Sequence, residues 1–181
     1  MTHIKKKISL IGFVFTSLSA QAIEMNFNPL SILTGATTLD ALFEVDQKIK
    51  FGPSVGFMSL SLNTVNVTAF DIGARAEYAF NGYQDDGGYI AGRLYYSNVN
   101  VSVQEDVLSC TSNSTTGTLL GGHAWRFGSG FSAKIGAGFK QVVVMDKGVA
   151  CETNGILVTT QESANKSEFK LAYEAGISWS F

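Results

Sequence analysis

Apolar and polar residues alternate with a period of two over long stretches of this chain. The pattern is clearest in residues 167–181, where every second residue from Phe169 to Phe181 is apolar or aromatic and those between are small or polar. Residues 70–80 and 131–140 show the same alternation. Because successive side chains of a β-strand point to opposite sides, the pattern predicts strands with one apolar and one polar face.

The alternation predicts eight strands that follow one another as antiparallel neighbours. We expect them near residues 24–33, 37–46, 49–60, 66–80, 88–101, 115–127, 131–144 and 167–181. For the first two segments, a single long bent strand is the alternative. The longest and most polar connections, residues 102–114 and 145–166, lie on one side of this arrangement. An even number of strands places both ends of the folded domain on the other side.

Residues 1–22 have the features of a secretory signal peptide. Lysines occupy positions 5–7, a short apolar segment covers 8–18, and Ala20-Gln21-Ala22 forms a small-x-small cleavage site. The apolar segment is shorter than the roughly 20 residues that span a bilayer, which favours a cleaved signal over a membrane anchor. We therefore expect a signal peptide at 1–22 and a single barrel domain at 23–181.

The orientation of the two faces separates a membrane barrel from a soluble one. The polar faces are rich in Gly and Ser, which suits a narrow interior, and aromatic residues such as Trp125 and Trp179 lie near strand ends, as in interfacial girdles. In lipid every backbone polar group needs a partner, so strands cross a membrane as a closed barrel. The expected fold is all-β: a single eight-stranded antiparallel transmembrane β-barrel of the up-and-down type. A soluble periplasmic lipocalin-like binder of an apolar ligand, with the faces inverted, is the main rival.

The charged residues of the predicted polar faces should line the barrel interior. Five are basic and three acidic, and they are Glu44, Arg75, Glu77, Arg93, Lys134, Lys140, Lys170 and Glu174. An eight-stranded barrel is just wide enough for side chains to fill, and buried charges are costly unless paired. The first interpretation is therefore a plug of ion pairs, and the second is a narrow channel or pocket for small polar solutes. Lys50, Asp71 and Arg126 are expected to join the set.

Net charge and cysteine content restrict the classes of partner and cofactor that we expect. Without the three lysines of residues 1–22, 10 of the 13 basic residues remain against 15 acidic ones, a formal charge of −5, which disfavours nucleic acid as a partner. Cys110 and Cys151 fall in the two long connections on the same side. In an oxidising compartment disulfides persist, so we predict a bond that ties these two loops together. No C-x-x-C motif accompanies them, and no metal or other cofactor is expected.

The last predicted strand carries a motif that is similar to one in a known group of proteins. The ending Ala175-Gly-Ile-Ser-Trp-Ser-Phe181 resembles the terminal strand of bacterial outer-membrane proteins, and residues 28–35 resemble the opening of a family of small outer-membrane barrels of uncharacterised function. The resemblance implies that the barrel-assembly machinery reads an assembly signal formed by Tyr173, Ile177, Trp179 and Phe181. It also implies location in the bacterial outer membrane, in contact with lipid and lipopolysaccharide, and names no activity.

Candidate catalytic groups are sparse. His123 is the one histidine of residues 23–181, and its position in the alternation places it on the outward apolar face. A lipid-modifying enzyme would need a nucleophile and an acid beside such a base, and no acid is near it on that face. Asp85 and Asp86 are interpreted as turn residues. We expect a non-enzymatic, monomeric protein with a structural or surface-binding role, whose outer loops could meet an unknown surface ligand.

Overall fold

The computed structural model describes residues 23–32, 35–103, 108–128, 130–144, 149–153, 156–160 and 167–181, and the expected signal peptide lies outside these ranges. Strands dominate the described residues. In chain order the elements are β1 (Ile23–Phe27), α2 (Pro29–Ile32), β2 (Ala36–Asp46), β3 (Ile49–Leu62), β4 (Val65–Ala79), β5 (Gly87–Val103), β6 (Leu108–Phe127), β7 (Phe131–Val144), β8 (Val149–Thr153), β9 (Ile156–Thr160) and β10 (Ser167–Ser180).

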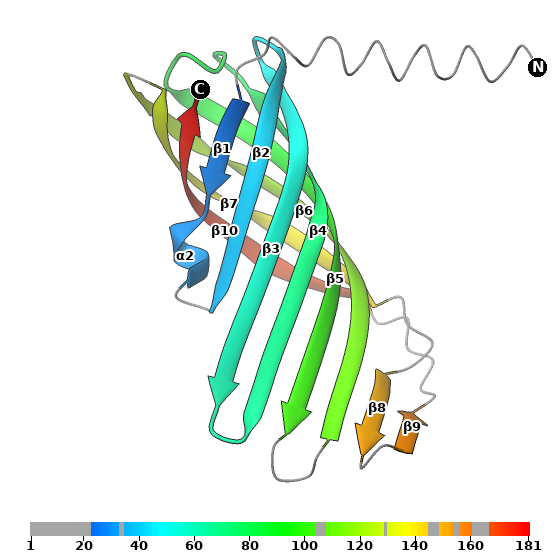
Figure 1. The fold of residues 1–181 in the computed structure, drawn as a ribbon. Coiled ribbons are helices and arrows are strands. Elements are labelled where there is room, and N and C mark those ends of the chain that lie inside the picture. Colours follow the sequence, from blue (N-terminus) through cyan, green and yellow to red (C-terminus); the bar gives the residue numbers. More distant parts are fainter. Residues whose placement is uncertain are drawn as a thin grey trace, which may run out of the picture.

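Eight of these strands close into a ring (Figure 1). Each of β1 to β6 pairs antiparallel with the next, β7 pairs with β10, and β10 returns to β1. The predicted eight-stranded up-and-down barrel is therefore confirmed. The hairpin of β8 and β9 lies outside the ring, where β8 pairs with residues 108–111 of β6.

The two ends of the barrel differ in their connections. We call the end where β1 begins and β10 finishes the terminal end; it also holds the connections 47–48, 80–86 and 128–130. The opposite, loop end holds the connections 63–64 and 104–107, and the hairpin of β8 and β9 projects from it (Figure 1). Asn63 makes the tight turn between β3 and β4 with a φ of 50°, a left-handed conformation that asparagine tolerates better than most residues.

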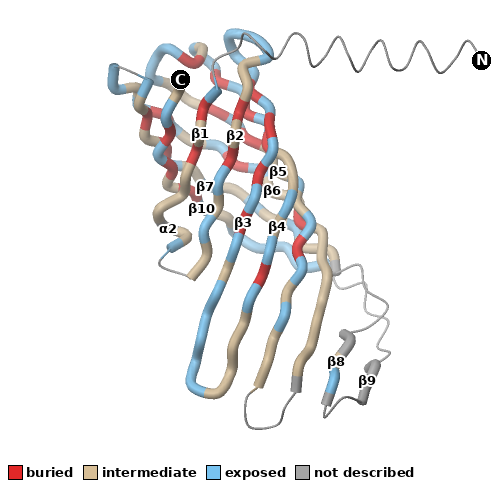
Figure 2. Tube along the Cα trace, in the orientation of Figure 1, coloured by how far each residue is buried: buried red, intermediate tan, exposed pale blue. Residues whose placement is uncertain are grey.

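Large apolar side chains point away from the barrel and charged ones point into it. On β4, Ile72 is 54% exposed, whereas Arg75 is 1% and Glu77 2% exposed. Apolar area left in water is unfavourable, so an apolar belt around a buried charged interior indicates a surface that meets lipid. The inverted, lipocalin-like arrangement does not occur. Burial is concentrated toward the terminal end (Figure 2).

The prediction of a strand over residues 24–33 is wrong beyond Phe27, and so is the alternative of one long bent strand. β1 ends there, and Pro29 begins the short helix α2. Proline suits the first helical turn because its missing N–H has no partner to lose there. Ser31 stabilises the turn by donating its hydroxyl to the carbonyl of Asn28 at 2.6 Å. The described part of the chain holds no helix with the length and apolar character needed to cross a membrane.

Both of the predicted long loops contain strands. β5 and β6 continue as a paired hairpin to Val103 and Leu108, and residues 149–160 contain β8 and β9. The polar stretch 109–114 has no alternation of large apolar and polar side chains, so the period-two pattern did not reveal it. Cys110 and Cys151 are register partners on β6 and β8, and a disulfide joins them. The predicted bond is present, but it connects two strands instead of two irregular loops.

Candidate functional site in the barrel interior

Arg75 is the centre of the interior near the terminal end. It projects from β4, and its guanidinium contacts both carboxylate oxygens of Glu174 on β10, at 2.6 and 3.1 Å. The same group reaches Glu77 at 2.9 Å. All three side chains are buried. A guanidinium that meets a carboxylate through two parallel hydrogen bonds forms one of the stronger and more directional polar contacts in proteins.

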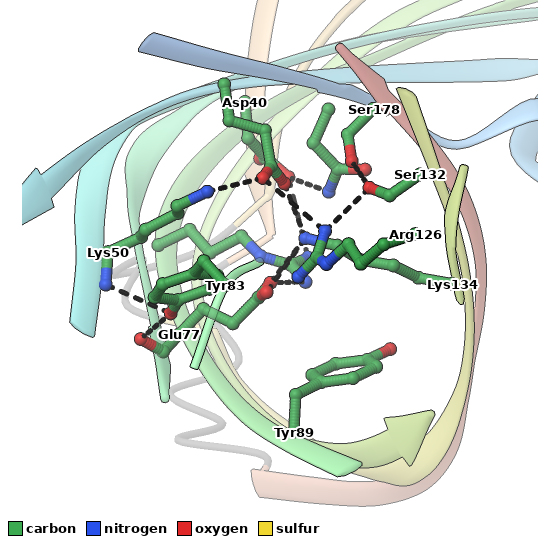
Figure 3. Close-up of polar contacts among 12 residues, drawn as sticks. Asp40, Lys50, Glu77, Tyr83, Tyr89, Arg126, Ser132, Lys134 and Ser178 are labelled. Atoms are coloured by element: carbon green, nitrogen blue, oxygen red, sulfur yellow. Dashed lines mark hydrogen bonds and ion pairs between the residues drawn. The ribbon is translucent and has the colours of Figure 1, made fainter. Parts of the chain in front are cut away.

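Lys134 forms the second centre, as Figure 3 shows. Its ammonium lies 2.6 Å from Glu24 on β1 and 2.8 Å from Glu77 on β4, and Glu24 also accepts from Lys50 at 2.7 Å. The acids and bases thus alternate across the interior, so that each buried charge has at least one partner of opposite sign. Such pairing offsets the several kcal/mol that each isolated ion would cost on burial.

Asp40 extends this network toward the loop end. It accepts from Arg93 at 2.7 Å and from the side-chain amide of Asn26 at 3.1 Å, and Arg75 lies 3.5 Å away. Asn26 and Asp40 are both buried, and so is Glu24. None of the three is among the interior charges predicted from the sequence. Glu24 and Asn26 do alternate with the apolar residues of 23–27, but this segment is too short for the alternation to predict an inward face.

Tyr83 closes the terminal end. It comes from the connection 80–86, and its hydroxyl donates to the carbonyl of Glu77 at 2.5 Å and accepts from the N–H of Lys50 at 3.0 Å. The ammonium of Lys50 lies 4.1 Å from the centre of its ring, a favourable cation–π distance. Burial raises the pKa of Tyr83 above its ordinary value, which keeps the hydroxyl a neutral donor.

Tyr89 occupies space that two glycines leave free. It lies on β5 and is 1% exposed. A Cβ on Gly136 would come within 2.5 Å of its hydroxyl oxygen, and one on Gly122 within 2.8 Å of its ring. Glycine at these positions of β6 and β7 therefore makes room for the ring of Tyr89. The hydroxyl donates to Glu174 at 3.2 Å.

The structure separates the predicted interior charges into two groups. Arg75, Glu77, Arg93, Lys134 and Glu174 lie together in the network around Arg75 and Lys134. The remaining three lie elsewhere. Glu44 sits at the mouth of the terminal end with its side chain 36% exposed, 3.3 Å from Lys50. Lys170 pairs with Glu168, both 55% exposed, and Lys140 forms no ion pair with any described residue.

Of the further expected interior residues, Lys50 and Arg126 join the network. Lys50 pairs with Glu24, and Arg126 lies 3.8 Å from the same carboxylate. Arg126 also donates to the hydroxyl of Ser132 at 2.7 Å, and Ser132 is hydrogen-bonded to Ser178 (Figure 3). These contacts tie β6, β7 and β10 together across the interior. Asp71 forms no ion pair with a described residue.

A cavity of about 380 Å³ lies between the network and the loop end. Arg93 and Lys140 line it together with Tyr95, Thr118 and Leu120. The wall is therefore half polar and half apolar, and its cations come from β5 and β7. A second cavity of about 380 Å³ lies at the terminal end beside Lys50 and Arg126, and both of these cations have an acidic partner there.

His123 is the one candidate catalytic side chain that the sequence predicts on the outward face. His123 is exposed on the apolar belt, as its position in the alternation predicts, with its ring 4.8 Å from that of Trp125. Among the described residues, no three His, Cys, Asp or Glu side chains group in a way that could hold a metal ion.

Comparison with known proteins agrees on the fold. No protein-family model matches the sequence, and no curated protein matches it. The crystal structure of Neisserial surface protein A (NspA) is similar over 89% of this chain and 93% of its own, with a TM-score of 0.52 and 15% identity. A major outer membrane protein from Thermus thermophilus is similar over 89% of this chain and 98% of its own, with a TM-score of 0.53 and 13% identity.

This chain has the fold of a small outer-membrane β-barrel. At these identities the likeness concerns the fold alone, and the interior network must be interpreted from its own residues.

Proposed function

We propose that this protein is a bacterial outer-membrane barrel with a closed interior and a structural or surface-binding role. The observation that carries the proposal is the paired network around Arg75 and Lys134, with Tyr83 beneath it. Side chains can fill an eight-stranded barrel, and here they are held in place by mutual ion pairs. A filled interior favours a rigid scaffold that presents its loop end over a conduit for solutes.

The same proposal covers the protein's location. Residues 1–22 direct export and are then removed, and the terminal end lies in the periplasm while the hairpin of β8 and β9 faces outward. The barrel-assembly machinery recognises the outward side chains Tyr173, Ile177, Trp179 and Phe181, which are 40–79% exposed. The barrel is a monomer in contact with lipid and lipopolysaccharide.

Location and folding are tested by a heat-shift gel on membrane fractions, run with and without reductant. A folded membrane barrel remains compact in detergent until it is boiled, so we expect two bands that differ in mobility in the outer-membrane fraction. A change on reduction is expected because the disulfide closes a 41-residue separation. Protein found wholly in the soluble periplasm, without a heat shift, would contradict the proposal.

The closed interior is tested by conductance of the purified protein in planar bilayers. We expect no unitary current, because the paired side chains around Arg75 and Lys134 lie across the interior. The channel interpretation predicts a current that changes in Arg93→Ala. A steady current through the unmodified protein, altered by this substitution, would replace the proposal with that of a narrow channel.

The surface-binding role is tested by removing residues 145–166 and measuring binding of whole cells to surfaces and neighbouring cells. The ring does not include these residues, so the heat shift should persist while any surface phenotype is lost. A matched variant with Cys110→Ser and Cys151→Ser keeps the hairpin and controls for the loss of the disulfide. Unchanged binding after the deletion would leave only the structural role.

A further inference from the structure

Basic residues form a row in register around the inner wall. Arg75 on β4 is the partner of Arg93 on β5, Arg93 is the partner of Thr118 on β6, and Thr118 is the partner of Lys140 on β7. Lys140 is in turn the partner of Lys170 on β10. Five neighbouring strands thus place four cations on one line across the sheet.

Burial changes steadily along this row. The side chain of Arg75 is 0% exposed, that of Arg93 14%, and that of Lys170 55%. Lys140 lies between the last two and is half-buried. The row therefore leads from the mouth of the loop end down to the network. Like charges directly opposite one another on neighbouring strands destabilise a sheet, so the row has an energetic cost that ion pairs must offset.

Acidic partners offset that cost at three of the four positions. Glu174 binds Arg75, Asp40 binds Arg93, and Glu168 binds Lys170. Lys140 has no acid of the described residues within ion-pair distance. In addition, the Nε–H of Arg93 is buried and donates to no acceptor of the described residues. Arg93 and Lys140 both line the cavity, and each therefore has a donor without an acceptor among the described residues.

The cavity beside these donors reaches the edge of β10. Successive residues of a strand face opposite sides, so a space confined to the interior would touch only one set of side chains. This cavity is lined by the inward residues Ala172 and Glu174 and also by the outward residues Leu171 and Tyr173. It therefore continues around the edge of the strand, from the interior toward the apolar belt.

The pairing of β10 explains this side opening. Residues 177–180 of β10 pair with β1, whereas residues 167–176 have a strand partner among the described elements only on the β7 side. α2 lies in the place that a longer β1 would fill, and it contacts both β10 and β2. Asn28 and Ser31 of this segment line the cavity too. Leu171 and Tyr173 are 61% and 69% exposed, so the opening lies within the lipid-facing belt.

We propose that this cavity binds the anionic head group of a single-chain amphiphile that reaches it from the membrane through the opening between β10 and α2. Lys140 and Arg93 meet the carboxylate or phosphate, Tyr95 and Thr118 offer hydroxyl groups, and the alkyl chain leaves past Leu171 and Tyr173 into the apolar belt. The proposal rests on the proposed membrane location and names a ligand class for the surface-binding role.

The test is isothermal titration of the full-length folded protein in dodecyl maltoside micelles. Dodecanoate is the probe, and butyrate and dodecyltrimethylammonium are its comparisons. We expect saturable binding of one dodecanoate per chain, at least about tenfold weaker binding of butyrate, which lacks the chain, and none of the cationic amphiphile. Butyrate keeps the carboxylate, so the difference between the two probes measures the burial of the alkyl chain.

Three variants assign the effect to the site. Lys140→Met should weaken dodecanoate binding by about tenfold or more, Lys140→Arg should retain it, and Lys48→Met, an exposed lysine in the β2–β3 connection, should leave it unchanged. A heat-shift gel of each variant checks folding separately, so that a failure of the membrane-barrel proposal is seen there and not in the titration.

Several outcomes would overturn the proposal. Equal affinity for butyrate and dodecanoate would mean a site for free anions from water and would remove the lateral route. Binding that is not saturable, or that is the same in Lys140→Met and Lys48→Met, would mean partition into the micelle and no site.

Discussion

The two halves of the barrel interior are built from the same residue types and yet differ in structure. Toward the terminal end, each buried charge has a partner within 4 Å, and the ring of Tyr83 packs against the ammonium of Lys50. Toward the loop end, Arg93 and Lys140 line an open cavity, and Lys140 has no acidic partner among the described residues. The difference shows that an inward charge does not by itself indicate a role. A charge with an ion-pair partner stabilises the barrel, whereas a charge without one can bind a ligand.

The largest expected effect is a difference in stability between variants at two lysines of β7 that share the inward face. Lys134→Met removes a buried ammonium and leaves Glu24 and Glu77 short of a partner, so we expect a loss of about 3–5 kcal/mol in unfolding free energy. Lys140→Met should cost less than about 0.5 kcal/mol because it breaks no ion pair. Urea titration followed by the heat-shift band measures both. Equal losses of unfolding free energy in the two variants would contradict the difference between the two halves of the interior.

A smaller effect is expected at the terminal end. Tyr83→Phe removes the hydroxyl that bridges Lys50 and Glu77, and we expect a loss of about 1–2 kcal/mol. Tyr78→Phe is the matched control, since Tyr78 is 40% exposed on the outward face. The same urea titration applies. If the two phenylalanine variants were equally stable, the role of Tyr83 in closing the barrel would be wrong.

Reduction of the disulfide should act locally. Cys110 and Cys151 join β6 to a hairpin outside the ring, so the barrel should retain its stability within about 0.5 kcal/mol. Limited proteolysis should instead become faster within residues 145–166. A large fall in urea resistance of the ring after reduction would show that the hairpin supports the barrel, contrary to this expectation.

The smallest effect is expected on the outward face. His123→Ala removes a ring contact with Trp125, and we expect folding to persist with a change below about 0.5 kcal/mol. Mass spectrometry of membrane lipids from cells with and without the protein should show no covalent change. Altered lipid A or phospholipid that depends on His123 would support the lipid-modifying alternative.

The sequence was informative where a strand combines a strong apolar face with charges on the other face. Arg75, Glu77 and Lys134 fall on long alternating segments, so their inward direction could be predicted. Their partners could not, because Arg75 and Glu174 are 99 residues apart in sequence and meet only when the ring closes. No local pattern encodes such a contact.

Other features were missed for distinct physical reasons. Tyr83 lies in a connection, where alternation has no meaning, and it turns back into the barrel. The strand extension at 108–114 is polar on both faces, so it has no period-two signal. The Asn28-Pro29 pair carries a signal for a helix start, but the apolar residues around it also fit the pattern of a strand.

The short pairing of β1 with β10 has a consequence for assembly and mechanics. The ring closes through residues 23–27 and 177–181, whereas β5 and β6 are joined from Gly87 to Val103. This seam brings together the segments most distant in the chain and so has the largest loop-closure entropy, while its ladder has the fewest register pairs in the ring. The seam should therefore form last during insertion, and a force that separates the two termini should open it before any other pair of strands.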